Sequence, residues 1–250
     1  MHLKSEFINN VRLVSEIFVI LASCSRILAG RSGASQILQH PMEVYAKYFW
    51  NEEAGLSSDT WNTDFTVCEA YRGLNSNMHT VEAFLAIADT LEREEYRKRA
   101  GRIINQVIRW AVGNNWRIIE HFSEKWKQNF EYNRERPDDP FKPYGATPGH
   151  GAEWARLIIQ WALLTFGDYR TEALQYIEAA EKLYQRAKKD VWNVDGASGL
   201  IYTTDWAGKS VVQDRYHWVL AEFIDTAAVL AHVTGKKLLL VLRRIDGVFK

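Results

Sequence analysis

Apolar side chains recur at three- and four-residue spacing through seven long segments of this 250-residue chain, the pattern of an amphipathic α-helix with one buried face. Prolines, which break helices, are nearly absent from these segments, because four of the five lie within residues 137–148. The sequence therefore predicts an all-α protein. The expected helices are Val11–Ala29, Ile37–Phe49, Val81–Leu91, Tyr96–Val112, Glu153–Phe166, Glu172–Ala187 and Trp218–Val233.

Several of the connecting loops are long and resemble short β-hairpins. Residues 49–61 and 191–206 each follow an expected helix, turn at a glycine (Gly55 and Gly199) and end with an acidic residue and a tryptophan close together. A repeated unit of helix, hairpin and helix is typical of a helical toroid. A complete (α/α)6 toroid needs roughly 400 residues at this helix spacing. We therefore expect a partial (α/α)6 toroid, with residues 1–235 as one barrel domain.

The composition excludes several classes of protein. The 31 Lys and Arg residues balance 31 Asp and Glu residues, so the chain lacks the positive charge that nucleic-acid binding needs. No apolar run approaches the roughly 18 residues of a membrane-spanning helix. The two cysteines form neither a disulfide framework nor a zinc-finger spacing, which favours the reducing cytoplasm. We expect neither nucleic acid nor a membrane as a partner.

The strongest candidate for a catalytic site is the segment Pro143–Trp154, in which proline and glycine place His150 at the junction of a loop and a helix. Unsatisfied N–H groups and the positive end of the helix dipole tend to keep an imidazole neutral there. A neutral imidazole can remove a proton from carbon, and Glu153, on the same helical face, is spaced to orient it or to exchange protons itself. The alternative is a histidine that merely caps the helix.

A second candidate cluster spans residues 71–82. Asn75 and His79 are four positions apart, so both point to one side of a helix, a spacing that suits a hydroxylated ligand. Arg72 adds a fixed charge with planar donors, which can polarise a carbonyl oxygen or hold an anionic substituent. Alternatively, the Ser and Asn residues here only cap the helix, and His79 is a core histidine with its hydrogen bonds satisfied.

A third candidate pair, Trp218 and Glu222, shares one helical face. A tryptophan beside a carboxylate suits a sugar, because the indole covers the C–H face and the carboxylate accepts hydroxyl protons. The alternative is that the tryptophans fill space between helices. His79 and His150 are each followed by Glu three residues later, but di-iron bundles use the opposite order, and HExxH is absent. We expect no metal.

The candidate site residues belong to a series of motifs that occur in this order along the chain: Tyr71–His79, Glu120–Phe122, Tyr144–His150, Glu153–Trp154, Tyr202–Trp206 and His217–Glu222. The series resembles the N-acylglucosamine 2-epimerase superfamily, and within it the bacterial mannose and sulfoquinovose aldose–ketose isomerases. The resemblance runs from about Phe18 to Gly235. It implies an (α/α)6 toroid, no organic cofactor, no required metal, and proton transfer between C1 and C2 of an open-chain sugar through a cis-enediol.

By motif position, the resemblance implies that His150 and Glu153 are catalytic acid/base groups. His79 matches a pocket histidine that takes part in ring opening or proton transfer. The substrate-contacting positions of the family are matched by Asn75, Trp218 and Glu222.

Family members also carry a pocket arginine from early helices and a second essential histidine from a late helix, and both lie outside the matching portion. The resemblance stops after Gly235, so residues 236–250 are expected to form a divergent C-terminal tail. We therefore expect a chain truncated at both ends. Such a chain exposes the apolar sides of its helices and associates through them, as a homo-oligomer or less specifically.

The sequence thus predicts a sugar aldose–ketose isomerase of the mannose or sulfoquinovose type, acting on a small-molecule sugar. One alternative is an N-acylglucosamine 2-epimerase, which returns the proton to the opposite face of C2. A glycoside hydrolase would instead use paired carboxylates such as Asp205 and Glu222. An inactive truncated fragment or a sugar-binding module is the remaining alternative.

Overall fold

The computed structural model describes residues 10–167 and 171–235. All seven predicted helices are present in this part of the chain, and the strands between them are only two or three residues long, so the all-α fold class is confirmed. None of the described helices combines the length and the apolar character needed to cross a bilayer. The predicted tail at 236–250 lies outside the described residues, and the expectation of one domain over 1–235 stays a prediction.

Contacts divide the chain into two compact units. Of the described residues, 10–105 and 121–129 belong to the first unit, and 106–120, 130–167 and 171–235 belong to the second. Helix α5 (Glu94–Gly113) contributes its first part to the first unit and its last part to the second. The chain therefore passes from one unit to the other more than once.

The first unit contains three further helical segments. The predicted helix Ile37–Phe49 ends in a wider π-helical turn, labelled η1. The segments are α2 (Leu13–Leu28), α3 (Ala34–Val44) with η1 (Tyr45–Phe49), and α4 (Leu74–Leu91).

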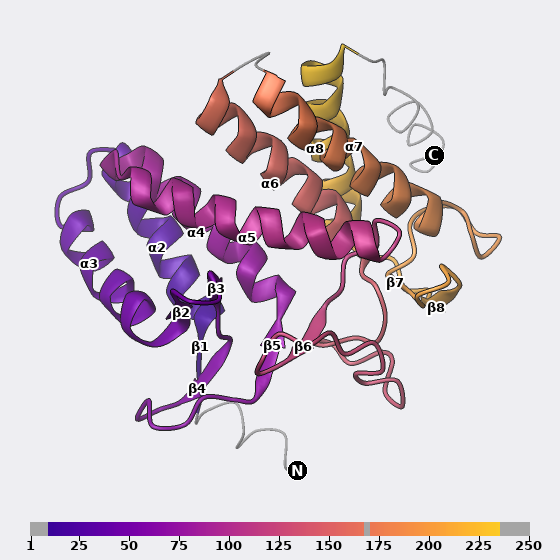
Figure 1. Ribbon diagram of the computed structural model, residues 1–250, viewed down its shortest axis with the longest axis horizontal. Coiled ribbons are helices and arrows are strands. Elements are labelled where there is room, and N and C mark those ends of the chain that lie inside the picture. The colour runs from indigo at the N-terminus through magenta and orange to yellow at the C-terminus, as the bar shows by residue number, and fades with distance from the viewer. Residues whose placement is uncertain (1–9, 168–170, 236–250) are drawn as a thin grey trace. The chain divides into compact units, whose positions relative to one another are not determined.

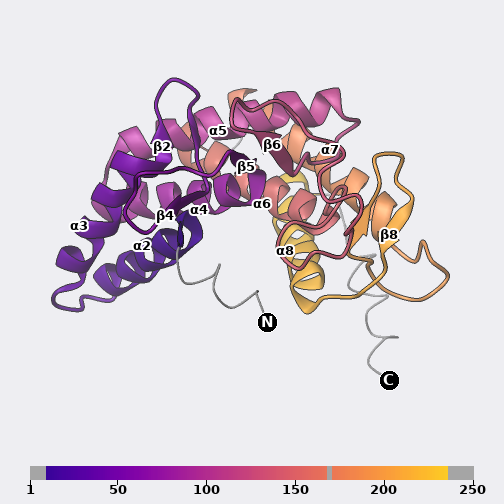
Figure 2. The same ribbon diagram turned by 90° about the horizontal axis from the view of Figure 1, so that it is seen from below.

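Three antiparallel strand pairs accompany these helices. The strands β1 and β5 lead directly into α2 and α4, so their pairs lie where these helices begin (Figures 1 and 2). The predicted hairpin after η1 is confirmed, and it turns at Gly55, whose φ of 66° favours glycine. The pairs are β1 (Asn10–Arg12) with β4 (Thr60–Asn62), β2 (Trp50–Asn51) with β3 (Leu56–Ser57), and β5 (Tyr71–Gly73) with β6 (His121–Ser123).

Helices α2 and α4 pack against each other (Figure 1), and both carry fully buried aliphatic or aromatic side chains. Ile17 and Ile20 of α2 and Val81 and Phe84 of α4 are at most 1% exposed. Burial of each such side chain contributes about 1.5–3 kcal/mol to folding. This packing explains why the apolar spacing in the sequence was sufficient to locate both helices.

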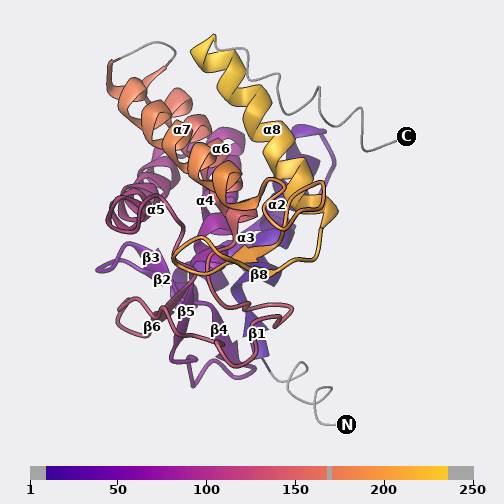
Figure 3. The same ribbon diagram turned by 90° about the vertical axis from the view of Figure 1, so that its right-hand side faces the viewer.

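The second unit contains α6 (Pro148–Phe166), α7 (Thr171–Val191) and α8 (His217–Thr234), together with the pair of β7 (Thr203–Thr204) and β8 (Ser210–Val212). Helix α6 packs against both α7 and α8, and Figure 3 shows the three helices running alongside one another. The start of α6, the end of α7 and the start of α8 all adjoin the strand pair. Loops from three helices therefore meet at one end of this unit.

Close packing in the second unit depends on small residues and one buried hydrogen bond. A Cβ on Gly151 would lie 3.2 Å from the Cβ of Ala187, so glycine lets α6 approach α7. The hydroxyl of Thr226 on α8 donates to the carbonyl of Ala152 on α6 at 2.8 Å. The indole of Trp154, in the second turn of α6, is also fully buried.

Two of the helices begin five or more residues before their predicted starts. Helix α4 begins at Leu74 rather than Val81, and Gly73 precedes it without any side-chain cap. The alternative in which the asparagines only cap the helix is wrong for Asn77, which lies inside the helix and exchanges hydrogen bonds with the backbone of Ser57 on β3 (2.8 and 3.1 Å). Likewise α6 begins at Pro148, where proline is favoured because its missing N–H has no partner in the first turn.

Candidate active site

The segment before α6 folds against β7, and this fixes the position of His150. Ala146 and Thr204 exchange two backbone hydrogen bonds of 2.9 and 3.0 Å. Gly145 has a φ of 89°, and a Cβ there would overlap the carbonyl oxygen of Thr204, so only glycine fits. His150 lies in the first turn of α6, and its N–H donates to the carbonyl of Thr147 at 2.9 Å.

A carboxylate from a distant part of the sequence holds the imidazole of His150. Its Nδ1 lies 3.1 Å from each carboxylate oxygen of Glu120, which directly precedes β6. The two side chains are only 15% and 5% exposed. Because a carboxylate accepts and cannot donate, Nδ1 is the donor. Among the described residues of its own unit, Nε2 of His150 has no hydrogen-bond partner.

The surroundings of His150 favour its charged form. Burial of the ring lowers the pKa, but the charge of Glu120 and its hydrogen bond raise it, and the carboxylates of Glu153 and Glu222 add to this rise. The pKa of His150 therefore lies above the usual value of 6.5. Three acidic side chains of one unit thus converge on a single imidazole.

Two expectations about His150 are wrong. The helix terminus was expected to keep the imidazole neutral, but the nearby carboxylates outweigh it and raise the pKa. Glu153 was expected either to orient the ring or to exchange protons itself, and the first alternative is wrong because the hydrogen bond to Nδ1 comes from Glu120. Glu153 is 5% exposed on the same helix and acts on the imidazole through its charge.

The indole of Trp218 covers one side of the His150 ring. The two ring centroids are 5.3 Å apart and the planes are inclined by 31°. Gly149 makes this possible, because a Cβ there would lie 2.7 Å from the far edge of the indole. Tyr202 packs edge-on against Trp218 at 6.1 Å, and burial raises the pKa of its hydroxyl to about 12. Trp218 and Tyr202 thus contribute an aromatic, uncharged wall to a site whose other neighbours are the three carboxylates.

Glu222 lies one turn after Trp218 on α8 and is paired with Arg156 of α6. The guanidinium Nε lies 3.3 Å from the carboxylate of Glu222 and 3.2 Å from that of Asp225. Glu222 is partly buried and contributes to the raised pKa of His150. The predicted pair of Trp218 and Glu222 therefore lies on the side of α8 that faces His150.

The other three predicted site residues belong to the first unit. Arg72 donates to the backbone carbonyls of Glu69 and Tyr71, so its charge is engaged locally. His79 lies in the second turn of α4, with Nδ1 2.8 Å from the carboxylate of Glu82 and with both side chains 23% exposed. The amide of Asn75 is partly exposed, and no described residue of that unit bonds it.

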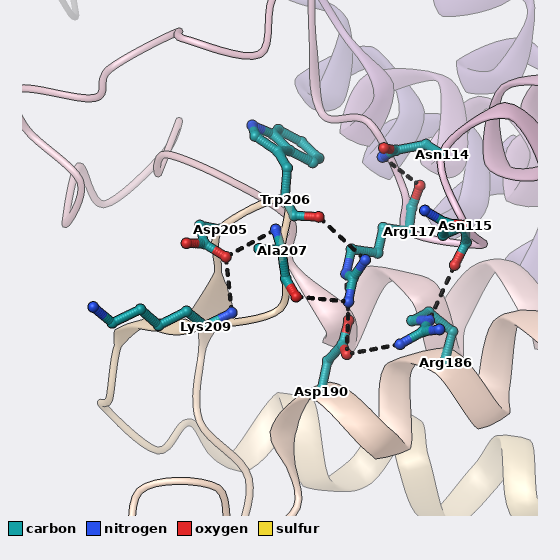
Figure 4. A network of polar contacts seen from close by, with 9 residues as sticks. All are labelled: Asn114, Asn115, Arg117, Arg186, Asp190, Asp205, Trp206, Ala207 and Lys209. Atoms are coloured by element: carbon teal, nitrogen blue, oxygen red, sulfur yellow. Dashed lines mark hydrogen bonds and ion pairs between the residues drawn. The ribbon is translucent and has the colours of Figure 1, made fainter.

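A buried ion pair anchors the segment that carries Glu120 (Figure 4). Arg117 is 8% exposed and donates to both carboxylate oxygens of Asp190 near the end of α7, at 2.7 and 3.1 Å. Its guanidinium also donates to the carbonyls of Trp206 and Ala207 in the β7–β8 turn, at 3.1 and 3.4 Å. One side chain thereby ties together α7, a turn and the residues before Glu120.

The sequence profile of the N-acylglucosamine 2-epimerase (GlcNAc 2-epimerase) family matches residues 9–244. This is nearly the whole chain. The chain belongs to the N-acylglucosamine 2-epimerase family. The predicted resemblance is thus confirmed, and the motif residues of the site occupy the part of the chain that the family profile covers.

Individual family relatives agree with this assignment. A D-mannose isomerase of Pseudomonas cannabina pv. alisalensis is 40% identical over 221 residues, which are 88% of this chain and 53% of the relative. A crystal structure of D-mannose isomerase superposes with a TM-score of 0.85 at 26% identity, covering 94% of this chain and 60% of that one. This chain therefore spans about half the length of the curated relatives it matches.

The fold is also shared by a more distant enzyme. The structure of cellobiose 2-epimerase from Spirochaeta thermophila DSM 6192 superposes with a TM-score of 0.75 at 17% identity, covering 95% of this chain and 59% of that one. The common architecture of helix pairs and short hairpins is the one that the sequence predicted. Similarity at this level establishes the fold alone.

Sequence reasoning assigned no role to Glu120, although a motif of the family resemblance begins with it. Its role depends on a contact with a residue thirty positions away, which no local pattern reveals. Conversely, Asp205, a candidate hydrolase carboxylate, accepts hydrogen bonds from the backbone of Ala207 and Lys209 (2.9 and 2.8 Å; Figure 4). Asp205 therefore serves the turn, and the family profile offers no support for a hydrolase.

Proposed function

We propose that this family member is a mannose-type aldose–ketose isomerase. Two findings support the proposal. One is the D-mannose isomerase relatives. The other is an imidazole beside Trp218 whose Nδ1 is engaged by Glu120, while its Nε2 bonds no described residue of its own unit. The second finding carries most weight, since removal of a proton next to a carbonyl needs a base whose pKa is close to the working pH. Histidine is the side chain that meets this requirement.

In the proposed reaction the open-chain aldose presents its C2–H bond to Nε2 of His150. The base takes that proton, the C1–C2 bond becomes the double bond of a cis-enediol, and the C1 carbonyl oxygen gains a proton. The O2 hydroxyl then loses its proton as C1 receives one, which gives the ketose with no net gain or loss of atoms. Glu153 is proposed to exchange protons with the substrate oxygens.

The remaining residues are proposed to bind the sugar. Trp218 covers its C–H face, and Glu222 accepts hydrogen bonds from its hydroxyls. In the first unit, His79 is assigned to ring opening or proton transfer and Asn75 to hydroxyl contacts. Arg72 keeps the substrate-binding role predicted from sequence only as a proposal, since it already bonds two carbonyls.

The proposal is tested by incubating the 250-residue chain with D-mannose in deuterated water and monitoring the sugar by ¹H NMR. We expect loss of the C2–H signal, incorporation of deuterium and accumulation of D-fructose. Exchange at C2 with accumulation of the C2 epimer and no ketose would identify a 2-epimerase instead. Absence of both exchange and ketose would refute both functions. Sulfoquinovose in a parallel sample tests the second predicted substrate type.

Two variants show whether His150 carries the activity. His150→Gln removes the base while keeping a side chain that hydrogen-bonds, and we expect a loss of about 10²–10⁴-fold in exchange rate. Glu178→Gln on α7 is the matched control, because Glu178 is 66% exposed and forms a surface ion pair with Lys182. Retention of activity in His150→Gln would contradict the assigned role.

A further inference from the structure

We propose that Glu120 is a positioning residue, which fixes the tautomer of His150 so that Nε2, and not Nδ1, is the atom that removes the substrate proton. The catalytic consequence rests on the proposed isomerase function. The positioning itself concerns two side chains of one unit, and it is testable without any turnover.

The contact geometry determines which nitrogen carries the proton. Both oxygens of Glu120 lie 3.1 Å from Nδ1 of His150, so the N–H has an acceptor on either side. A carboxylate offers no proton in return. The neutral imidazole is therefore Nδ1–H, and its lone pair lies on Nε2, on the opposite side of the ring. A free histidine would distribute its proton over both nitrogens.

The carboxylate is itself held in place. Residues 117–122 are all at most 8% exposed, so Glu120 lies within a buried segment. Arg117 at the start of that segment bonds Asp190 and two carbonyls of the β7–β8 turn (Figure 4). The side chains of Ile118 and Ile119 between them are 2% and 1% exposed. A side chain fixed in this way loses little further freedom when it orients its partner.

The charged groups around His150 determine how well the ring tolerates the proton it accepts. Glu120 faces it from the buried segment, Glu153 from its own helix and Glu222 from α8, where Arg156 offsets part of the charge. When Nε2 takes up a proton the ring becomes an imidazolium. Its Nδ1–H donates to Glu120, whereas Glu153 and Glu222 act on it through their charge. Glu120 therefore stabilises the charge that develops in the reaction.

The experiment compares wild type with Glu120→Gln, using ¹⁵N-histidine labelling and long-range ¹H–¹⁵N NMR above the pKa of His150. His150→Gln identifies the signal among the seven histidines. In wild type we expect a pure Nδ1–H form. In Glu120→Gln we expect a mixture of tautomers and a midpoint of titration at lower pH. Glu178→Gln, whose side chain is exposed on α7, should leave both readouts unchanged.

The kinetic arm measures kcat and KM across pH for the same proteins. For Glu120→Gln we expect kcat to fall by about 10²-fold or more, as for other oriented bases, with KM little changed and the rising limb of the pH profile displaced to lower pH. A variant that merely loosened the fold would lower activity without displacing that limb. Glu120→Asp retains the carboxylate on a side chain that is one methylene shorter. We expect this variant to keep the Nδ1–H tautomer and to have a kcat between those of wild type and Glu120→Gln.

The outcomes separate the two proposals. An Nε2–H tautomer in wild type, or an unchanged tautomer and pH profile in Glu120→Gln, would overturn the positioning role. If Glu120→Gln does not fold, Glu120→Asp and the wild-type tautomer still decide. If wild type neither exchanges C2–H nor forms ketose, the isomerase proposal fails, whereas the tautomer measurement still tests Glu120.

Discussion

His150 shows how burial and charge compete at a single side chain. Burial alone lowers the pKa of a histidine, yet three carboxylates reverse the direction. The folded state therefore binds a proton at this position more tightly than the unfolded chain does. This difference links the stability of the protein to pH.

The pH dependence of stability has a definite sign. Because the folded pKa is raised, the contribution of His150 is fully present below about pH 6.5 and is lost as the pH rises through the folded pKa. We expect the free energy of unfolding of wild type, relative to His150→Gln, to decrease from about pH 6 upward. Urea unfolding of both proteins over this range measures it. A difference that grows with pH would contradict the assignment.

Gly149 gives a second prediction at the scale of one residue. The methyl group of Gly149→Ala meets the far edge of the Trp218 indole at 2.7 Å, so the ring that lies beside His150 must shift. We expect a rise in KM for the sugar and a change in tryptophan fluorescence, with the fold retained because the end of a side chain can shift. Gly113→Ala is the control, since its Cβ meets nothing within 4 Å. Unchanged fluorescence and KM would contradict it.

Individual site residues were predictable where the role depends on residue type and helical spacing. Trp218 and Glu222 share a face because they are one turn apart, and both lie near His150. Glu120 was not predictable in the same way, because folding brings it to His150 across thirty positions. The charge of Glu120 also explains why His150 was expected to be neutral, whereas its pKa is raised.

At the scale of elements, the ion pair between Arg117 and Asp190 carries the largest expected effect on stability. Asp190→Ala leaves a guanidinium that is 8% exposed without its carboxylate, and removal of one partner of a buried pair costs about 3–5 kcal/mol. Urea unfolding measures this loss. Glu178→Ala, at the exposed pair with Lys182, should cost at most about 1 kcal/mol. Equal effects of the two substitutions would contradict the structural role of Arg117.

The presence of each helix was predictable, because its buried face repeats every three to four residues. The residue at which each helix begins was less predictable. The first turns of α4 contain Ser76 and Asn77, whose side chains form hydrogen bonds with residues outside α4. The polar residues that were interpreted as a loop capping the helix therefore lie inside the helix. The sequence shows the polar residues but not the partners that satisfy them, and those partners decide where a helix begins.

At the scale of the whole molecule, association through apolar helix surfaces stays a prediction. Leu28 of α2 and Ile37 of α3 are 67% and 51% exposed, which favours contact with another copy. We expect sedimentation velocity to show species larger than one chain at rising concentration, and Leu28→Lys with Ile37→Lys to reduce them. A single chain at every concentration in wild type would contradict this.

The course of the chain through its two units has a consequence for engineering. Because the chain returns to the first unit at 121–129 after entering the second at 106, the units are interleaved and neither is one continuous stretch. A gene divided after residue 105 deprives β5 of its partner β6. A gene divided after residue 129 encodes Glu120 and His150 in separate polypeptides, so fragment complementation would have to rebuild that contact between two molecules.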